Sequence, residues 1–317
     1  MSPRAIVTGG AGFIGSHVVD ALLADGYGVT VVDDLSSGDA ARVASEAELR
    51  ELDIVDLEPL RSVVEEVAPS TIFHLAAQAS VVASLADPGR DCEVNVRGTL
   101  NVVQAAGECG APVVFTSTGG ALYGDEVPRP TGEGQLPAPL SPYGASKLAA
   151  EAYVKTWSLA SGIPHAVCRL GNVYGPRQSP HGEAGVVAIF AYHLYTRRAP
   201  KLFGHGEPTR DYVYVADVVS AVRAAAGRSG TYNIATGVET DVMTIWEGLR
   251  EAARRADPDS AAAQPEPELA DLRPGELKRS CLDVTLAERE LGWRAEVPIS
   301  EGLGLTYDAL VQELKRT

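Results

Sequence analysis

Residues 6–15 of the chain read Ile-Val-Thr-Gly-Gly-Ala-Gly-Phe-Ile-Gly, and this stretch decides the fold. Gly10, Gly12 and Gly15 satisfy the pattern G-x-G-x-x-G, and Gly9 with the last two satisfies the variant G-x-x-G-x-x-G. The first glycines permit a tight turn and a close approach of backbone to pyrophosphate, and Gly15 permits close packing of a helix on a strand. The free N–H groups at the start of that helix favour a phosphate. The stretch therefore predicts a strand, a dinucleotide-binding loop and a helix in succession.

An acidic residue stands where such a loop needs an acceptor for ribose. Asp33 follows an expected second strand over residues 28–32 and lies 18 positions after Gly15. A carboxylate at this place accepts a hydrogen bond from a ribose 2′-hydroxyl. Its charge would repel a 2′-phosphate, and no arginine stands next to it in the sequence. We therefore expect the cofactor to be NAD rather than NADP.

Strand-like and helical segments alternate over the first half of the chain. We expect strands at 4–7, 28–32, 71–75, 112–117 and 165–170, and helices at 12–24, 57–67, 95–107 and 141–161. Strands that alternate with helices pair in parallel and are covered by helices on both faces. The expected fold class is α/β, a Rossmann-type doubly wound parallel sheet.

The pattern loosens after about residue 170 and indicates a smaller, mixed α/β lobe. We expect a loop at 175–185, a helix at 186–198, extended segments at 200–203 and 209–215, and an exposed connection at 256–267. We expect an NAD-binding domain of residues 1–170 that also receives about 211–235. Residues 171–210 and 236–317 would form the substrate-binding lobe.

Composition and charge exclude several classes of partner. The 317 residues are 45% hydrophobic and 22% charged, with a formal net charge of −15. Binders of nucleic acid and of anionic membranes present basic surfaces, so we expect neither partner. The sequence shows no signal peptide and no membrane-spanning stretch, and its four cysteines are scattered, as reduced thiols are. We expect a cytoplasmic protein without a metal site.

A tyrosine and a lysine stand four residues apart in Tyr143-Gly-Ala-Ser-Lys147. This spacing places both side chains on one face of a helix. A neighbouring ammonium group favours the phenolate, so Lys147 is expected to lower the pKa of Tyr143 and to make it a usable base. Taken alone the pair is a weak signal, because surface helices contain it by chance. Its position downstream of a nucleotide loop makes it a candidate acid/base couple.

With these motifs in one order, the chain resembles the extended short-chain dehydrogenase/reductase family, and more closely its nucleotide-sugar epimerases of the UDP-glucose 4-epimerase group. The supporting segments are Leu52-Asp53-Ile54, His74-Leu-Ala-Ala-Gln78, Asn95-Val-Arg-Gly-Thr99, Arg169-Leu-Gly-Asn172-Val-Tyr-Gly-Pro-Arg177, Arg210-Asp-Tyr212 and Arg273-Pro-Gly-Glu276. The resemblance covers nearly the whole chain.

The resemblance implies a role for each matching residue. Tyr143 would be the acid/base, and Lys147 would bind the nicotinamide ribose. The residues expected to bind the cofactor are Gly9, Gly12, Phe13, Ile14, Gly15, Asp33, Asp53, Ile54, Leu75, Ala76, Ala77, Gln78, Asn95, Tyr143 and Lys147. Those expected to bind the substrate are Thr118, Tyr143, Asn172, Arg177, Phe203, Arg210 and Arg273. Planar guanidinium groups suit bidentate contacts to a diphosphate.

The chain departs from the family at the hydroxyl that assists the tyrosine. Four residues before Tyr123-Gly124, where the family holds Ser or Thr, this chain has Gly119. We expect Thr118 to take this role through a local shift of the loop, with Ser117 as the second candidate. Related 4,6-dehydratases carry an Asp-Glu pair after their threonine, and Gly119-Gly120 stands there instead. Dehydration then lacks its acid and base.

The resemblance thus implies NAD-dependent 4-epimerisation of a UDP-sugar through a transient 4-keto intermediate. It also implies a homodimer that associates through the helices at 95–107 and 141–161. The substrate stays open. Ser280 is small enough for an N-acetyl group, Arg177, His181, His193 and Arg197 suit a hexuronate, and a dTDP-sugar is a further alternative. A net dehydrogenase or reductase and a non-catalytic NAD sensor are the competing classes.

Overall fold

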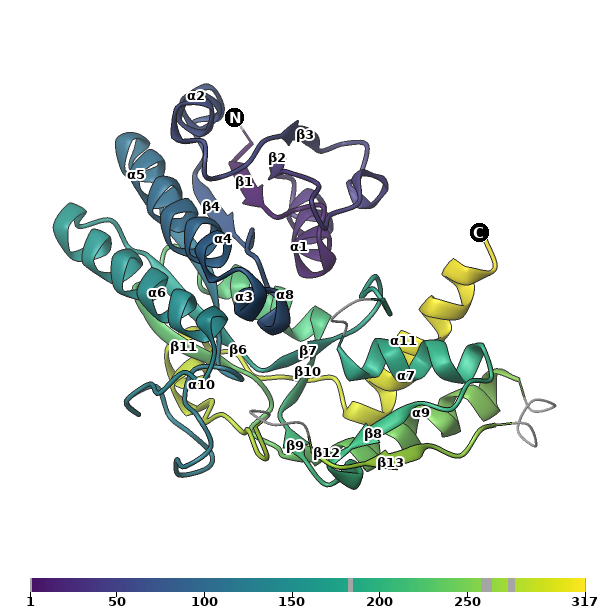
Figure 1. The fold of residues 1–317 in the computed structure, drawn as a ribbon. Coiled ribbons are helices and arrows are strands. Elements are labelled where there is room, and N and C mark those ends of the chain that lie inside the picture. Colours follow the sequence, from purple (N-terminus) through teal and green to yellow (C-terminus); the bar gives the residue numbers. More distant parts are fainter. Residues whose placement is uncertain (1, 182–184, 258–263, 273–276, 317) are drawn as a thin grey trace.

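Seven parallel strands form the central sheet of the computed structural model, which describes residues 2–181, 185–257, 264–272 and 277–316 (Figure 1). Their spatial order is β11 (Gly230–Ile234), β6 (Ala166–Leu170), β5 (Val113–Thr118), β4 (Thr71–His74), β1 (Arg4–Thr8), β2 (Gly28–Asp33) and β3 (Glu48–Glu51). The chain order reverses between β1 and β4. In open parallel sheets, ligands bind outside the carboxyl ends of the strands at this switch point.

Helices cover both faces of the sheet, because apolar residues run continuously along its strands. On β1, Ile6 faces a core shared with α2 (Leu57–Val67), α5 (Thr99–Cys109) and α6 (Pro142–Ser161). Its neighbours Ala5 and Val7 face the opposite core, which α1 (Phe13–Ala24) and α8 (Val215–Ala224) cover. This alternation follows from the two-residue period of a strand. The expected α/β fold class is confirmed.

The second lobe lies below the sheet in Figure 1 and is built around three packed helices, α7 (Val186–Tyr195), α9 (Val242–Ala256) and α11 (Ile299–Leu314). Trp246 on α9 is fully buried, edge-on to Phe190 at a centroid distance of 5.5 Å. Among the described residues, two small sheets belong to this lobe: β8 (Lys201–Phe203) with β13 (Glu268–Ala270), and β9 (Thr209–Arg210) with β12 (Thr240–Asp241). A third pairs β7 (Asn172–Tyr174) with β10 (Tyr212–Tyr214), where the chain passes back toward the central sheet. Helix α10 (Thr285–Leu291) contacts β11.

Several expected boundaries were wrong. The helix expected at 95–107 begins earlier, as a π-helical segment η2 (Glu93–Gly98) that continues into α5. The helix expected at 186–198 ends at Tyr195. The segment 209–215 divides into β9 and β10, and Val215 already begins α8. Part of the expected connection at 256–267 lies outside the described residues.

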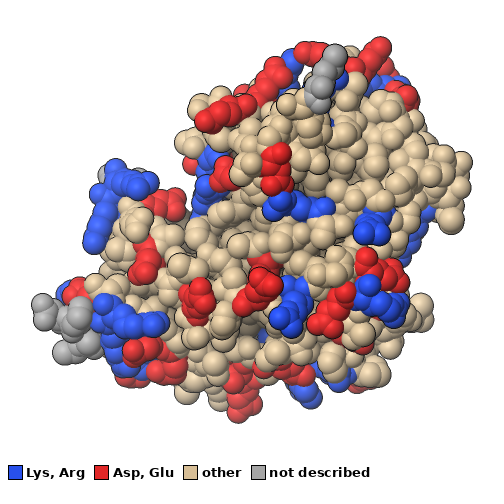
Figure 2. Space-filling view, turned by 180° about the vertical axis from the view of Figure 1, so that it is seen from behind, with Lys and Arg blue, Asp and Glu red and all other residues tan. Residues whose placement is uncertain are grey.

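Strands β3 and β11 were not expected. β3 reads Glu-Leu-Arg-Glu at the edge of the sheet, and β11 begins with Gly230. Because β11 and α8 join the sheet although they follow the second lobe's first segment, we propose the domain division 1–170 with 211–235 against 171–210 with 236–317. Within the described ranges, no helix is long and apolar enough to cross a membrane. On the face seen in Figure 2, acidic and basic side chains are interspersed.

Candidate active site

Two glycines, Gly9 in the loop after β1 and Gly15 in the first turn of α1, leave no room for a side chain. Gly9 has a φ of +72°, and a Cβ atom there would lie 2.6 Å from the backbone nitrogen of Ala76. A Cβ atom at Gly15 would lie 2.0 Å from the carbonyl oxygen of Gly9. Helix α1 begins at Phe13 without a side-chain cap. Its first N–H groups are therefore free to stabilise an anion.

Asp33 is held at the end of β2 by the backbone of the adjoining loops. Its Oδ2 accepts from the Ala11 N–H and its Oδ1 from the Leu35 N–H, both at 2.9 Å. Burial raises the pKa of the Asp33 carboxyl group, and the two backbone donors oppose that rise. Each carboxylate oxygen keeps a further lone pair for a ribose hydroxyl.

The glycine loop and Asp33 border a cavity of about 630 Å³ at the carboxyl ends of β1, β2 and β4. Its volume lies in the range of small-molecule and cofactor sites, ~300–1,000 Å³. Twelve of the residues expected to bind the cofactor line it: Gly9, Gly12, Phe13, Ile14, Gly15, Asp33, Asp53, Ile54, Leu75, Ala76, Ala77 and Gln78. The closed glycine turn, the ribose acceptor and the cavity size fit NAD.

Asn95 lies behind this cavity and braces its wall. Its amide accepts from the Gln78 N–H at 3.0 Å and donates to the Gln78 carbonyl at 2.9 Å. The same Nδ2 contacts Asp91 and Ser146, each at 3.1 Å. Asn95 thus connects the cofactor cavity to helix α6 and holds Gln78 in place. It is not among the residues that line the cavity.

Helix α6 carries the tyrosine and the lysine on one face. Its start is defined by Ser141, which accepts from the Gly144 N–H at 3.2 Å, and by Pro142 in the first turn. The Lys147 Nζ donates to the Thr116 carbonyl at 3.0 Å and lies 4.8 Å from the centroid of the Phe115 ring. Burial lowers the pKa of Lys147 to about 8.

The pKa of Tyr143 moves in the direction opposite to the expectation. Burial raises it to about 12, a hydrogen bond with Thr118 opposes the rise, and the negative charge of Asp91 adds to it. Desolvation of a phenol disfavours its charged form, and here this effect outweighs the hydrogen bond with Thr118. The resting chain therefore holds Tyr143 protonated.

The two candidate hydroxyls at the end of β5 bond different residues of α6. The Thr118 hydroxyl hydrogen-bonds Tyr143 and accepts from the Ala121 N–H at 3.2 Å. The Ser117 hydroxyl instead donates to Glu151 at 2.7 Å, on the buried side of α6. Arg169 completes that site, since its Nε and Nη2 contact the same carboxylate at 2.9 and 2.6 Å.

Three residues of the site were not predicted from the sequence: Glu151, Asp91 and Arg90. Glu151 follows Lys147 by four residues on α6, and this helical spacing was the available signal. Asp91 and Arg90 come from α4 (Pro88–Cys92), and Arg90 contacts Asp53 at 2.9 Å beside the cofactor cavity. No local pattern marks these two residues.

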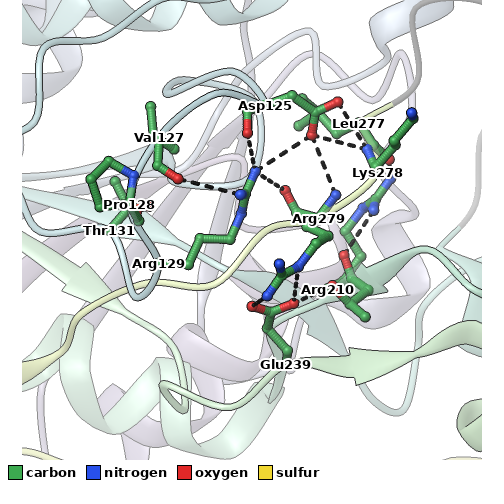
Figure 3. A network of polar contacts seen from close by, with 11 residues as sticks. Asp125, Val127, Pro128, Arg129, Thr131, Arg210, Glu239, Leu277, Lys278 and Arg279 are labelled. Carbon is green, nitrogen blue, oxygen red and sulfur yellow. Dashed lines mark hydrogen bonds and ion pairs between the residues drawn. The ribbon is translucent and has the colours of Figure 1, made fainter.

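Two of the expected diphosphate ligands, Asn172 and Arg210, lie on β7 and β9. A Cβ atom on Gly120 would lie 3.2 Å from the Asn172 Oδ1, so the Asn172 side chain adjoins the loop after Thr118. The Arg210 guanidinium donates to the carbonyl groups of Thr209 and Leu277, each at 2.8 Å (Figure 3). Arg273 lies outside the described residues.

The segment 277–282 forms a wall beside this loop and is held by charged side chains (Figure 3). The Asp125 carboxylate accepts from the backbone N–H groups of Lys278 and Arg279 at 3.0 and 3.3 Å. The Arg279 guanidinium makes two bonds to Glu239, at 2.8 and 2.6 Å. Arg129 donates to the Arg279 carbonyl at 3.1 Å.

Two further residues were expected to bind the substrate: Arg177, which contacts α1, and Phe203, which lies at the end of β8. Arg177 has a φ of +66°, and its Nη2 contacts the Asp20 carboxylate on α1 at 2.6 Å. Asp20 therefore neutralises the charge that would attract a hexuronate. Phe203 ends β8, which pairs with β13 in the second lobe. The residues that the structure does bring together are Tyr143, Lys147 and Thr118.

Comparisons with known proteins agree with this geometry. The family described as "NAD dependent epimerase/dehydratase" matches residues 5–235. The "UDP-glucose 4-epimerase" of Mycolicibacterium smegmatis is 45% identical over 314 residues, which cover 96% of this chain and 97% of the relative.

Two solved structures are also similar. The UDP-glucose 4-epimerase of Thermotoga maritima, solved with UDP-glucose, has a TM-score of 0.93 and 42% identity, over 98% of this chain and 99% of that one. That of Thermus thermophilus, solved with NAD, has a TM-score of 0.88 and 41% identity, over 97% and 99%.

Proposed function

The chain belongs to the NAD-dependent epimerase/dehydratase family, and from this premise we propose that it is an isomerase that interconverts UDP-glucose and UDP-galactose. The observation that carries the proposal is the triad on α6 and β5, in which Tyr143 hydrogen-bonds Thr118 and lies one helical turn before Lys147. The loop after Thr118 is Gly119-Gly120, without the carboxylate pair that elimination requires.

The chain's own residues move one proton at the sugar. When NAD is bound, it supplies reversible oxidation at C4 of the sugar. As a phenolate, Tyr143 would take the proton of the C4 hydroxyl as the 4-keto sugar forms, and would return it to the C4 oxygen after the sugar has turned its opposite face to the cofactor. Thr118 donates a hydrogen bond that favours the phenolate, and Lys147 places a positive charge on the same helix face.

The turning sugar needs a fixed anchor. Asn172 and Arg210, with Arg273 from the segment outside the described residues, would hold the diphosphate. Arg210 spends two of its donors on the carbonyls of Thr209 and Leu277, which keeps its planar guanidinium in one orientation. A fixed diphosphate with a free hexose would let either face of C4 meet the same cofactor, which is reduced in the first step and reoxidised in the second.

The proposal is tested with purified protein, NAD and UDP-galactose. UDP-glucose should appear without accumulation of NADH, and Tyr143→Phe should abolish the conversion while NAD binding persists. Stoichiometric release of NADH would show a net dehydrogenase instead. Comparison of kcat/KM on UDP-galactose, UDP-GalNAc, UDP-glucuronate and dTDP-glucose identifies the preferred sugar and base.

A substrate with an N-acetyl group is the second candidate. Ser280 is half-buried in the wall segment 277–282, beside Gly119 and Gly120, so three small residues meet there. UDP-GalNAc should then react with a kcat/KM comparable to that of UDP-galactose. Ser280→Tyr should reduce turnover of the N-acetyl substrate only.

We also propose that the protein is a homodimer. Val102 and Val103 on α5 are buried in the core and are not available to a partner, whereas Tyr153 and Leu159 on α6 are 43% and 87% exposed. Large apolar side chains exposed on one helix suit contact with a second copy. Analytical ultracentrifugation of the Leu159→Glu variant should show a weakened dimer.

A further inference from the structure

Asp91 is a buried carboxylate that the proposed reaction does not yet use. It lies on α4 and is only 1% exposed. Its Oδ1 accepts from the Gln78 amide at 2.8 Å and from the Asn95 amide at 3.1 Å. Its Oδ2 is equally buried and has no hydrogen-bond partner. Within the part of the chain that the structure describes, Asp91 forms no ion pair with a lysine, arginine or histidine.

A buried carboxylate with an unpartnered oxygen is costly, so it persists where a nearby charge compensates for it. The negative charge of Asp91 raises the pKa of Lys147 against the lowering effect of burial, and it also raises the pKa of Tyr143. Lys147 is therefore the cation that interacts electrostatically with Asp91 across the interface of α4 and α6.

The other charged groups around Lys147 are already matched. Glu151 on α6 also favours the Lys147 ammonium group, but Arg169 binds its carboxylate through two bonds and Lys155 lies 3.5 Å from it. His74 on β4 is buried and neutral, because burial and the Lys147 charge lower its pKa to about 3.

The charged groups on the Asp91 side have partners of their own. Arg90 on α4 contacts Asp53 and Glu93 at 2.9 and 3.2 Å, and Asp87 caps the start of α4. Among the described residues, Asp91 is thus a charge near the tyrosine–lysine pair without an ion-pair partner of its own.

We propose that Asp91 is a positioning residue for the 4-epimerisation, which holds Lys147 in its ammonium form beside Tyr143 and keeps Gln78 in the wall of the cofactor cavity. The inference rests on the proposed function. A neutral Lys147 could neither stabilise the Tyr143 phenolate nor donate all of its protons to a ribose. The same negative charge also raises the pKa of Tyr143, since Asp91 acts on both groups.

The proposal predicts a specific change in pH dependence. Loss of the Asp91 charge should lower the pKa of Lys147 and of Tyr143 together, by roughly one unit each. Activity that requires a phenolate and an ammonium group then shifts toward acid on both limbs. For a lysine pKa near 8, a drop of about one unit reduces the protonated fraction at pH 8 from about one half to about one tenth.

The test compares Asp91→Asn with Asp87→Asn over a wide pH range. Both variants remove one negative charge from α4, and asparagine can still cap the helix at position 87, where the side chain is exposed. Only D91N should shift the kcat profile toward acid. D91S, which leaves room for water, should give the same shift and replaces D91N if that variant does not fold.

A second readout does not depend on turnover. The phenolate absorbance of Tyr143, obtained by subtraction of a Tyr143→Phe background, should titrate at lower pH in D91N than in the parent protein. A lower kcat with an unshifted pH profile and an unshifted phenolate titration would overturn the proposal. Absence of 4-epimerase activity in the unaltered protein would instead refute the proposed function, and the phenolate titration would still test the coupling.

Discussion

Replacement of Thr118 by valine removes one hydroxyl group and preserves the shape of the side chain. In the structure this hydroxyl hydrogen-bonds Tyr143 and opposes the effect of burial on its pKa. Valine keeps two methyl-sized branches at Cβ, so the end of β5 and the Gly119-Gly120 loop should remain in place. The variant therefore removes the hydrogen bond with Tyr143 and, with it, the acceptor of the Ala121 N–H at 3.2 Å.

The expected loss follows from the charge of the acceptor. A hydrogen bond to a charged group contributes about 1.5–3 kcal/mol, compared with about 1 kcal/mol for a neutral pair. The bond to Tyr143 strengthens as the phenolate forms, so its loss raises the barrier and leaves ground-state binding nearly unchanged. At about 1.4 kcal/mol per tenfold change, kcat should fall by about 10- to 150-fold with KM nearly constant.

The assay is steady-state conversion of UDP-galactose, with Ser117→Ala as the matched control. Ser117 is the adjacent hydroxyl but donates to Glu151, which keeps both bonds from Arg169, so kcat should stay within about threefold. Thr118→Ser should recover most of the activity. A near-normal kcat for T118V, or a larger loss for S117A, would refute the assignment of the hydroxyl.

Three further outcomes follow from buried groups. Arg169→Met leaves the Glu151 carboxylate buried without its partner, so the free energy of unfolding in urea should fall by about 3–5 kcal/mol, and the double variant with Glu151→Met should recover much of it; a loss below about 1 kcal/mol would contradict this. Gly15→Ala places a Cβ atom 2.0 Å from the Gly9 carbonyl and should weaken NAD binding by at least about tenfold, measured by calorimetry, while the circular dichroism spectrum persists. The pKa of His74 is about 3 in the folded chain and about 6.5 when unfolded. Below pH ~6.5 the unfolded state then binds a proton that the folded state does not bind. The free energy of unfolding should therefore decrease as the pH is lowered from ~6.5 toward ~3, by about 2 kcal/mol at pH 5, and His74→Gln should lack this pH-dependent loss.

The sequence predicted best where local patterns act. The helix Leu57–Val67 was predicted to the residue, since its apolar positions follow the helical period. β3 was not predicted because an edge strand of charged residues has little apolar pattern to detect. β11 was not predicted because Gly230 and Asn233 weaken the strand pattern. In the structure the buried Asn233 side chain is accommodated by hydrogen bonds with Tyr123 and Thr131.

The residues of the site likewise divide into those that local sequence patterns predict and those that only tertiary contacts bring together. The spacing of Tyr143 and Lys147 is local, so it could be found in the sequence. The partners of Arg177 and Arg169 could not, because Asp20 and Glu151 lie 157 and 18 residues away in the chain. Tertiary structure can also reverse the direction of a predicted pKa shift. An ammonium group near a phenol predicts a lowered pKa for Tyr143, but the burial of Tyr143 raises its pKa.

A directed chain of hydrogen bonds shows how the nucleotide loop and the catalytic helix keep their relative positions. The Thr99 hydroxyl donates to the Asn95 carbonyl at 2.6 Å, so His74 must donate through Nε2, at 2.9 Å, and accept through Nδ1 from Thr8 at 2.7 Å. The tautomer of His74 is thereby determined. Asn95 in turn contacts Ser146, next to Lys147, so buried polar contacts join β1 to α6. The hydroxyl, imidazole and amide groups in these contacts are each fixed in orientation by their hydrogen bonds. Such rigid support is what a proton transfer between one tyrosine and one sugar hydroxyl requires.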